Sequence, residues 1–236
     1  MSLNLGIIAS SRSTTTPTPA VVTSGMVLYL DAGNVLSYPG TGTMWTDLSL
    51  NGNNGTLTNG ASYNSNNGGS ILFDGANDYV STGRSLFPSA LQDRTAQIWF
   101  KKTNSGTVDV LFGYGSNSNG TMFGSFILDT NLIYFWGFNV DTSIGYTITT
   151  NVWYNLAFTL NSGVLIAYIN GSQVSTFSPS ISTVIPTLIP SNLGINIHGG
   201  TNAWHGNISI YMIYNRALTS SEVLQNFNAN KSRYGY

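Results

Sequence analysis

The sequence predicts an all-β protein: a jelly-roll sandwich of two antiparallel sheets with one short helix near its C-terminus. Short segments alternate apolar and polar residues, as strands with one buried face do. Turn-forming Gly and Asn separate these segments. The 236 residues contain no cysteine, so packing rather than disulfides must hold the fold together. A sandwich of this length usually forms one domain.

An extended arm is expected before this domain. Residues 10–24, SSRSTTTPTPAVVTS, are rich in Ser, Thr and Pro, which favours an extended connector over helix or central strand. We therefore predict an arm over residues 1–24 and a sandwich over residues 25–236. The arm could add a strand to a partner or fray into solvent. Its apolar docking residues would be Leu3, Leu5, Ile7 and Ile8.

Alternation is clearest in residues 153–160, WYNLAFTL, and 207–214, NISIYMIY. In the second segment we expect Ile208, Ile210, Met212 and Tyr214 to face the core. Residues 164–174 indicate a hairpin, because the Asn170-Gly171 dipeptide suits a type I′ turn. Further strands are expected at residues 26–31, 71–74, 78–82, 94–101, 108–114, 122–128, 132–138, 145–149 and 191–197. Residues 49–69 are expected to form a long surface loop.

The helical signal lies at residues 219–230 and includes Glu222, the only glutamate. Thr219-Ser220-Ser221-Glu222 matches a capping box, and Leu218 and Val223 occupy the positions of a hydrophobic staple around it. Glu222 is therefore predicted to cap the helix rather than to catalyse.

Composition argues against several functions. Only 7% of residues are charged and the net charge is -1, so nucleic acid is not an expected partner. The N-terminal residues contain no basic n-region and no segment reaches membrane-spanning length, so neither Sec export nor membrane insertion is expected. This Asn- and Thr-rich composition suggests a protein assembled inside a cell and used outside it, as virion components are.

Catalytic motifs are lacking, and we expect the protein not to be an enzyme. Asp74 and Asp78 flank a turn in FDGAND, where aspartate usually accepts from backbone amides. His198 and His205 have no neighbouring cysteine or carboxylate in sequence to complete a metal site.

Calcium is a more plausible ligand than a catalytic metal, although no cofactor is required. Hard cations take loop carboxylates, amides and carbonyls, which abound in DLSLNGNNG and FDGAND. Asx turns without metal are the competing interpretation. The candidate ligands are Asp47, Asp74, Asn77 and Asp78.

Aromatic residues supply the binding hypothesis, because sugar rings stack on π-surfaces without needing charge. Burial in the core is the alternative for each ring. Trp204 lies in a Gly/Asn-rich loop and is expected to be the most exposed. The carbohydrate-binding candidates are Trp204, Trp136, Tyr114 and His205.

Five segments together resemble the laminin G-like, concanavalin A-like lectin/glucanase superfamily, particularly the versions found in bacteriophage structural proteins. They are MVLYLDAGN, WTDLSLNGNNGTLTNG, GGSILFDGANDYV, WYNLAFTLNSGVLIAYINGSQV and WHGNISIYMIYNRALTSSEV, in order over residues 26–223. The resemblance implies ligand binding on the concave sheet or rim loops, with calcium in some members. The chain departs from the pattern at Asn207 and Ser209, where relatives often carry acidic residues, and at Leu50, where Gly is common.

We therefore expect a non-enzymatic phage virion protein, either a capsid decoration or a fibre, at the virion surface. Residues 1–24 would attach it to other virion proteins, and the sandwich would be displayed and adhere to surface glycans. The alternative is a dedicated carbohydrate-binding module, or adhesin, for host polysaccharide. A homo-oligomer is the default expectation for a particle protein.

Overall fold

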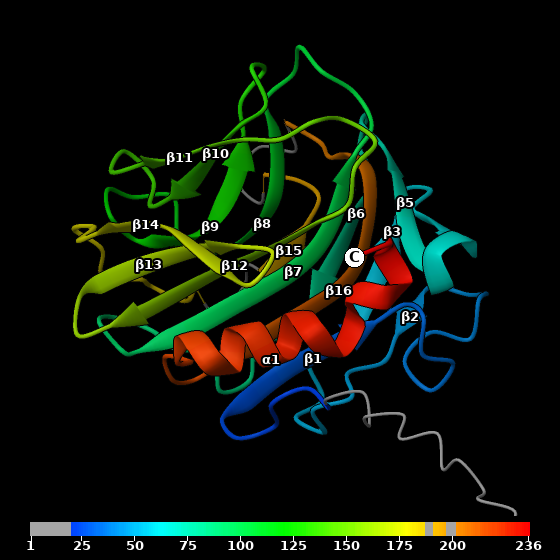
Figure 1. Ribbon diagram of the computed structural model, residues 1–236, viewed down its shortest axis with the longest axis horizontal. Helices are drawn as coiled ribbons and strands as arrows, with labels where there is room; N and C mark the ends of the chain where they lie inside the picture. The colour runs from blue at the N-terminus through cyan, green and yellow to red at the C-terminus, as the bar shows by residue number, and fades with distance from the viewer. Residues whose placement is uncertain (1–19, 187–190, 197–201) are drawn as a thin grey trace, which may run out of the picture.

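The computed structural model describes residues 20–186, 191–196 and 202–236, and it confirms an all-β sandwich with one α-helix (Figure 1). The predicted docking residues Leu3, Leu5, Ile7 and Ile8 lie outside the described residues. So do His198 and part of the loop that precedes Trp204.

The first antiparallel sheet, here called sheet A, has the order β14-β13-β12-β7-β16-β5-β4, with β1 also pairing with β16. The three longest strands, β12, β7 and β16, lie next to one another in this order. The strands are β1 (Met26–Asp31), β4 (Ser62–Asn64), β5 (Ser70–Asp74), β7 (Arg94–Lys102), β12 (Tyr154–Asn161), β13 (Val164–Ile169), β14 (Ser172–Phe177) and β16 (His205–Tyr214).

The second antiparallel sheet, sheet B, has the order β11-β10-β9-β8-β15-β6-β3-β2. Its strands are shorter and include the three that carry the site described below, β8 to β10. They are β2 (Met44–Trp45), β3 (Gly55–Thr58), β6 (Tyr79–Thr82), β8 (Asp109–Gly115), β9 (Met122–Ile127), β10 (Leu132–Trp136), β11 (Thr142–Thr147) and β15 (Ser191–Leu193).

The predicted loop over residues 49–69 is wrong in part, because it contains β3, β4 and the 3₁₀ turn η1 (Asn66–Gly68). Both strands are short and polar, so they give no alternating signal of their own. They are strands because β3 pairs with β6 and β4 pairs with β5. Pairing with a neighbour decides their structure.

The core between the sheets is confirmed in β12, where Leu156, Phe158 and Leu160 face inward. The predicted face of β16 is wrong beyond Ile208. A register shift lies between Ile208 and Ile210, so Tyr211 and Ile213 face the core instead. An irregularity of one residue moves every later side chain to the opposite face of a strand.

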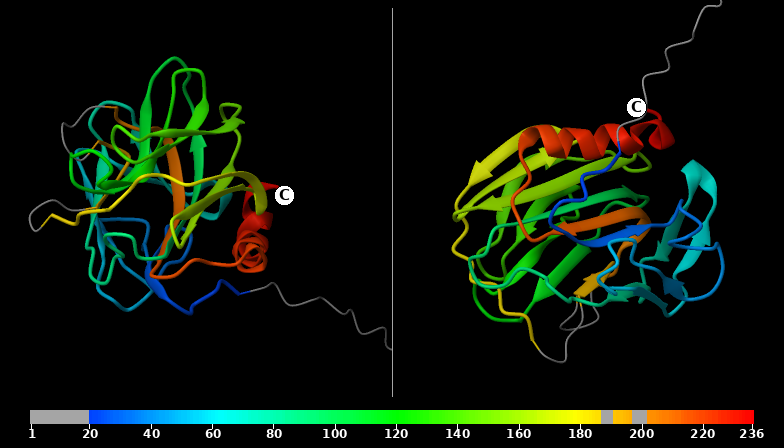
Figure 2. Two further views of the ribbon diagram at one scale, coloured as in Figure 1. Left: turned by 90° about the vertical axis from the view of Figure 1, so that its left-hand side faces the viewer. Right: turned by 90° about the horizontal axis from the view of Figure 1, so that it is seen from below.

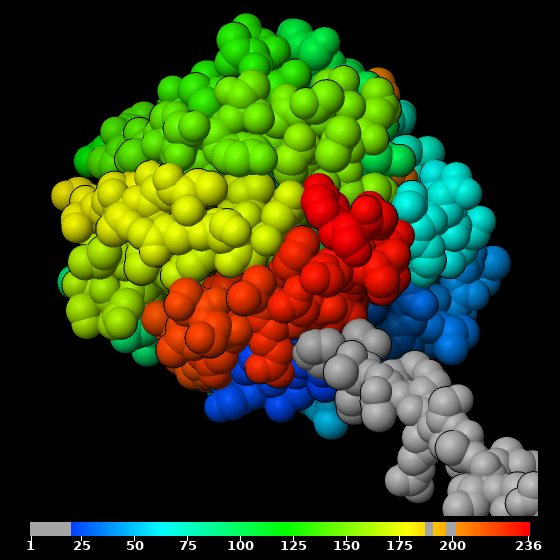
Figure 3. Space-filling model, viewed as in Figure 1, coloured from blue at the N-terminus to red at the C-terminus, as the bar shows by residue number. Residues whose placement is uncertain are grey.

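A second apolar cluster covers the outer face of sheet A. Helix α1 (Ser220–Asn230) and the 3₁₀ helix η2 (Lys231–Tyr234) run across this sheet (Figures 1 and 2). Phe227 and Tyr234 stack on Trp99 of β7, with ring centroids 5.4 and 4.0 Å away. Helix and C-terminal residues thereby fill the middle of this face (Figure 3). Because α1 hides this face, β16 is buried on both sides.

Residues 20–24, the described part of the predicted arm, lie against α1. The Val22 amide donates to Asn226 Oδ1 at 2.7 Å, and its carbonyl accepts from the Tyr214 hydroxyl at 2.9 Å. The side chain of Val22 is buried in the cluster beneath the helix. Residues 20–24 therefore pack with the sandwich.

The capping box is confirmed. The Glu222 amide donates to Thr219 Oγ1, and the Thr219 amide donates to Glu222 Oε2. Leu218 and Val223 are both buried in the cluster under the helix, as a staple requires. Glu222 also pairs with Arg216, whose Nη2 lies 2.7 Å from Oε1. This side-chain hydrogen bond to Arg216 lowers the pKa of Glu222 to about 2.

Candidate functional site

The outer faces of the two sheets differ in what packs on them. The outer face of sheet A lies under α1, η2 and residues 20–24. The outer faces of β8, β9 and β10 in sheet B border a cavity. Successive side chains of a strand point to opposite faces of the sheet. In β9 and β10, Phe123 and Phe135 point into the core, so Phe126 and Trp136 lie on the outer side. A ligand that binds a sheet face has this side available.

A cavity of about 220 Å³ on this outer face combines aromatic rings with amides and one carboxylate; we call it the aromatic pocket. Its floor comes from β8, β9 and β10, and its walls come from the turn after β10 and from segments that follow β15 and precede β16. Its lining residues are Val108, Val110, Phe126, Trp136, Phe138, Asn139, Asp141, Asn196 and Asn202.

Two glycines make room for Trp136 on the sheet. Gly113, Gly124 and Trp136 are cross-strand neighbours on β8, β9 and β10. A Cβ on Gly113 would lie 2.8 Å from Trp136 Cζ3, and one on Gly124 would lie 3.1 Å from Cε3. The indole therefore lies across the sheet over both glycines. Only 6% of Trp136 is exposed, so the ring contributes an edge to the pocket rather than a free platform.

The turn after β10 holds a ring in an unusual backbone conformation. Phe138 and Asn139 have φ of 59° and 58°, in the left-handed region that bulky residues rarely adopt. The Phe138 carbonyl accepts from the Gly120 amide at 2.9 Å, and Asp141 Oδ1 accepts from the Gly137 amide at 2.9 Å. These bonds fix the turn and half-bury the Phe138 ring against the outer cluster.

Asp141 is the carboxylate of the aromatic pocket. Its partial burial raises the pKa, and the backbone amides of Gly137 and Phe138 oppose that shift by donating to the charged form. Because the carboxylate accepts from the turn that carries Phe138, Asp141 positions this wall of the pocket.

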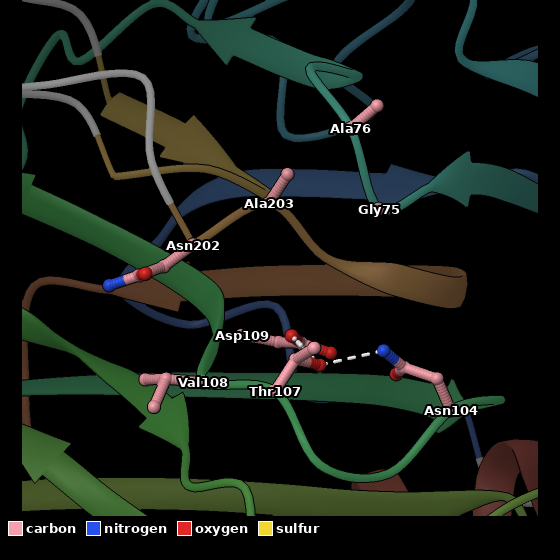
Figure 4. A pocket seen from close by; sticks show the side chains of 8 residues that line it. All are labelled: Gly75, Ala76, Asn104, Thr107, Val108, Asp109, Asn202 and Ala203. Carbon is pink, nitrogen blue, oxygen red and sulfur yellow. Dashed lines mark hydrogen bonds between the residues drawn. The ribbon is translucent and has the colours of Figure 1, made fainter.

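A second cavity of about 350 Å³ adjoins the first at the rim of the sandwich; we call it the polar pocket (Figure 4). The Gly75-Ala76 turn lies on one side of it, and a chain of hydrogen bonds lies on the other (Figure 4). Asn104 Nδ2 donates to Thr107 Oγ1, which donates to Asp109 Oδ1, each at 2.6 Å. Asp109 also pairs with the fully buried Lys102 at 3.3 Å.

The expectation of an exposed ring at Trp204 is wrong, because Trp204 is 0% exposed and packs edge-on against Phe100 with centroids 5.6 Å apart. Tyr114 is also buried, between Phe87 and Phe123, with its hydroxyl 3.4 Å from Arg94 Nη1. Both rings belong to the core between the sheets. Of the predicted aromatic residues, Trp136 lines the aromatic pocket.

His205 is half-buried at the start of β16 and pairs in register with Asp74 of β5. Its imidazole packs against Gly75, where a Cβ would lie 2.8 Å from the His205 Cβ. His205 therefore packs against the Gly75-Ala76 turn. It is not among the described lining residues of either pocket.

The predicted cation ligand Asp47 serves its own loop instead. Asp47 Oδ1 accepts from the Tyr29 and Ser49 amides at 2.9 Å, and Oδ2 accepts from Ser49 Oγ and the Asn53 amide at 2.8 and 3.0 Å. Four donors thus fill both carboxylate oxygens. Calcium binding at Asp47 stays a prediction, since these contacts show only that the carboxylate is an acceptor for its own loop.

The FDGAND turn is likewise built on Asx contacts. Asp74 Oδ1 accepts from the Ala76 amide at 2.8 Å, and Asp78 Oδ2 accepts from the Asp74 amide at 3.0 Å. Burial raises the pKa of Asp78. Asn77 is exposed, and its carbonyl accepts from Asn59 Nδ2. Within the described ranges, no three His, Cys, Asp or Glu side chains gather as a metal site would require.

Residue-by-residue reasoning missed most of the two pockets. Phe126 could have been found from the alternation of β9, and Phe138 from the aromatic end of LIYFWGFNVD. Asn104, Thr107 and Asn202 give no sequence signal, because the loop between β7 and β8 and the segment before β16 meet only in the folded chain.

Comparison with known families decides the classification. The model of the concanavalin A-like lectin/glucanases superfamily matches residues 74–224, well over half of the chain. The chain belongs to this superfamily. The match covers β6 to β16 and includes every residue of both pockets. No curated protein sequence matches the chain.

Solved structures with this lectin-like sandwich share its fold at low identity. Domain 4 of an extracellular arabinanase from Geobacillus stearothermophilus, in complex with arabinotriose, has a TM-score of 0.64 and 20% identity, over 85% of this chain and 97% of that one. The binding domain of Paraclostridial Mosquitocidal Protein 1 has a TM-score of 0.65 and 19% identity, over 88% and 52%. Trypanosoma rangeli sialidase in complex with sialic acid has a TM-score of 0.65 and 16% identity, over 92% and 35%.

These structures share the sandwich fold with the chain, which spans only about a third of the sialidase. In the described part of this chain, no helix has the length and apolar character needed to span a membrane.

Proposed function

We propose that the domain is a non-catalytic carbohydrate-binding module that holds a glycan in the aromatic pocket. The observation that carries this proposal is the composition of the pocket on the outer side of sheet B: aromatic rings of Phe126, Trp136 and Phe138 together with amides and a carboxylate. Apolar walls with a few fixed polar groups are typical of small-ligand sites. Sugars suit such a site, since their CH faces pack on rings and their hydroxyls bond to amides and carboxylates.

The conformation of Phe138 supports the same proposal. A phenylalanine at φ 59° costs about 1 kcal/mol relative to the right-handed region. Glycine would avoid that cost, but it would remove the ring from the pocket wall. Backbone strain of this kind tends to persist where a side chain has a role in binding.

The carboxylates at the pockets favour binding over hydrolysis. Glycosidases commonly use two carboxyl groups flanking the scissile bond, one as acid and one as nucleophile or base. Asp109 is 1% exposed and is engaged by Lys102 and Thr107, and Asp141 accepts from the turn it stabilises. Both carboxylates accept hydrogen bonds or form ion pairs that hold the fold. We therefore propose that the bound glycan is released without being hydrolysed.

The test compares the wild type with Phe138→Gly on a broad glycan panel. This change removes the ring and relieves the positive φ at once, so binding should fall at least tenfold while stability changes by less than about 1 kcal/mol. Leu50→Gly is the matched control, because Leu50 also has positive φ, at 67°, but is 93% exposed and lines neither pocket. It should keep full binding.

Retention of glycan by Phe138→Gly at wild-type affinity would overturn the aromatic pocket as the site. No binding by the wild type to any panel glycan would overturn the module proposal itself. Product release from a bound oligosaccharide, followed by chromatography, would contradict the non-catalytic assignment.

A second candidate function is display on a phage particle, as a capsid decoration or fibre protein attached through residues 1–24. One observation favours it. Residues 20–24 are held against α1 on the outer side of sheet A, through Val22 and through Arg216 Nε, which donates to the Ser24 carbonyl at 2.9 Å. The aromatic pocket lies on the outer side of sheet B. Attachment to the particle on the side of sheet A would leave the aromatic pocket on sheet B free to bind glycan.

The display proposal is tested by deleting residues 1–19, which leaves every described contact in place. The truncated protein should keep the wild-type unfolding midpoint and lose co-sedimentation with particles. If the truncated protein still co-sediments, attachment through these residues is wrong, whatever the glycan result.

A further inference from the structure

We propose that the ligand is an uncharged oligosaccharide that spans the aromatic and polar pockets, with one sugar unit in each. This inference rests on the proposed glycan binding and adds the size and charge of the ligand. It follows from three features of the pockets: the wall that they share, the unpartnered amide oxygen of Asn104 and the absence of lysine and arginine from their described lining residues.

The two pockets adjoin each other, because they share Val108 and Asn202 as lining residues. Asn202 is held there by its backbone, since its carbonyl accepts from the Val110 amide at 2.9 Å. Val108 enters the shared wall from the loop that leads into β8 (Figure 4). A chain of sugars lying along Val108 would therefore pass from one cavity to the other.

The aromatic pocket alone is small for a ligand site, at about 220 Å³. Small-molecule sites usually occupy about 300–1,000 Å³. Adding the polar pocket, about 350 Å³, brings the groove into that range. A single sugar would leave most of the available wall uncontacted.

The polar pocket carries a buried acceptor without a partner, Asn104 Oδ1, which has no hydrogen bond. The neighbouring Asp109 Oδ2 is held in an ion pair by Lys102 Nζ at 3.3 Å. Buried acceptors usually find a donor. Sugar hydroxyls are donors, and a small rotation of the Asn104 side chain would present its amide oxygen to one.

The charge of the groove disfavours acidic sugars. Asp141 contributes a carboxylate, the Asp109 carboxylate is already paired with Lys102, and the described lining residues of the two pockets include no lysine or arginine. Lys102 lies behind Asp109 with no exposed side-chain surface, and its ammonium also donates to the Thr107 carbonyl at 3.1 Å. A sialic or uronic acid carboxylate would meet the like charge of Asp141, without a lysine or arginine among the described lining residues to compensate it.

The experiment measures affinity by calorimetry for a neutral sugar that the panel identifies, as monosaccharide and as trisaccharide, and for the same trisaccharide carrying a terminal uronic or sialic acid. The neutral trisaccharide should bind at least tenfold more tightly than the monosaccharide, and the acidic one at least tenfold more weakly than the neutral one. Asn104→Ala should lower trisaccharide affinity at least threefold and leave monosaccharide affinity unchanged.

Asp141→Asn provides the charge control, because the amide oxygen can still accept from the Gly137 amide. It should improve binding of the acidic trisaccharide relative to the neutral one. Equal affinities for monosaccharide and trisaccharide would overturn the two-pocket ligand, and preferred binding of the acidic sugar would overturn the uncharged ligand. Either result, with binding still lost in Phe138→Gly, would leave the proposed module intact.

Discussion

Arg233 and Asp31, 202 residues apart, form a two-oxygen ion pair in which Nη1 lies 2.8 and 3.1 Å from the carboxylate oxygens. Nη2 of the same arginine donates to Ser209 Oγ at 3.1 Å. The pair thus ties the C-terminal η2 to the end of β1 and to β16 at its register shift. Burial of the Asp31 side chain, 8% exposed, makes this contact important for stability.

Replacing Arg233 with methionine should destabilise the domain by about 3 kcal/mol, because Asp31 is left as a buried carboxylate without its cation. Urea unfolding followed by tryptophan fluorescence measures the change. Ser232→Ala, at an exposed neighbouring position, is the control and should stay within about 0.5 kcal/mol of the wild type. An Arg233→Met variant as stable as the wild type would show that the pair contributes nothing net.

The helix cap should make stability depend on pH. In the folded state Arg216 holds the pKa of Glu222 at about 2, below its usual value of 4.5. Because the folded pKa is the lower one, the stabilisation is complete above pH 4.5 and is lost as the pH falls towards 2.

Glu222→Ala should therefore cost about 1 kcal/mol at pH 7. Its difference from the wild type should shrink below pH 4.5 and vanish near pH 2. Unfolding titrations at a series of pH values measure this, with exposed Ser221→Ala as control. A difference that stays constant from pH 7 to pH 2 would contradict a role for the charged carboxylate.

Gly113→Ala should weaken glycan binding by displacing Trp136, since the added Cβ would lie 2.8 Å from Cζ3 of the indole. Trp136→Phe offers a smaller ring that relieves the contact. In a double-mutant cycle, the loss from Gly113→Ala should be smaller in the Trp136→Phe background. Additive losses in binding free energy would mean that Gly113 acts independently of the ring.

Chelation should leave glycan binding unchanged. Both Asp47 oxygens are filled by N–H and O–H donors, and Asp74 and Asp78 accept from the backbone of their own turn. We therefore propose that no calcium is needed. Affinity measured in excess calcium and again in EDTA should agree within twofold. A tenfold loss in EDTA would instead assign a cation to the rim loops.

Local signals let the sequence alone predict much of the fold. Alternation with a period of two identified β12, and the Asn170-Gly171 dipeptide identified the turn between β13 and β14, where both residues have positive φ. The spacing of Thr219 and Glu222 predicted the capping box, and both of its hydrogen bonds are present. Each of these depends on residues a few positions apart, so chain neighbours are sufficient to specify it.

Tertiary structure decided which aromatic rings belong to the site. A period of two separates the faces of a strand but does not say which face is covered, and here α1 covers sheet A while β8 to β10 remain open on sheet B. Trp204 follows a loop rich in glycine yet fills the core. Asn104 and Asn202 meet at one pocket because β7 ends, and β8 and β16 begin, at the same rim of the sandwich. Such contacts depend on long-range pairing, which no local pattern encodes.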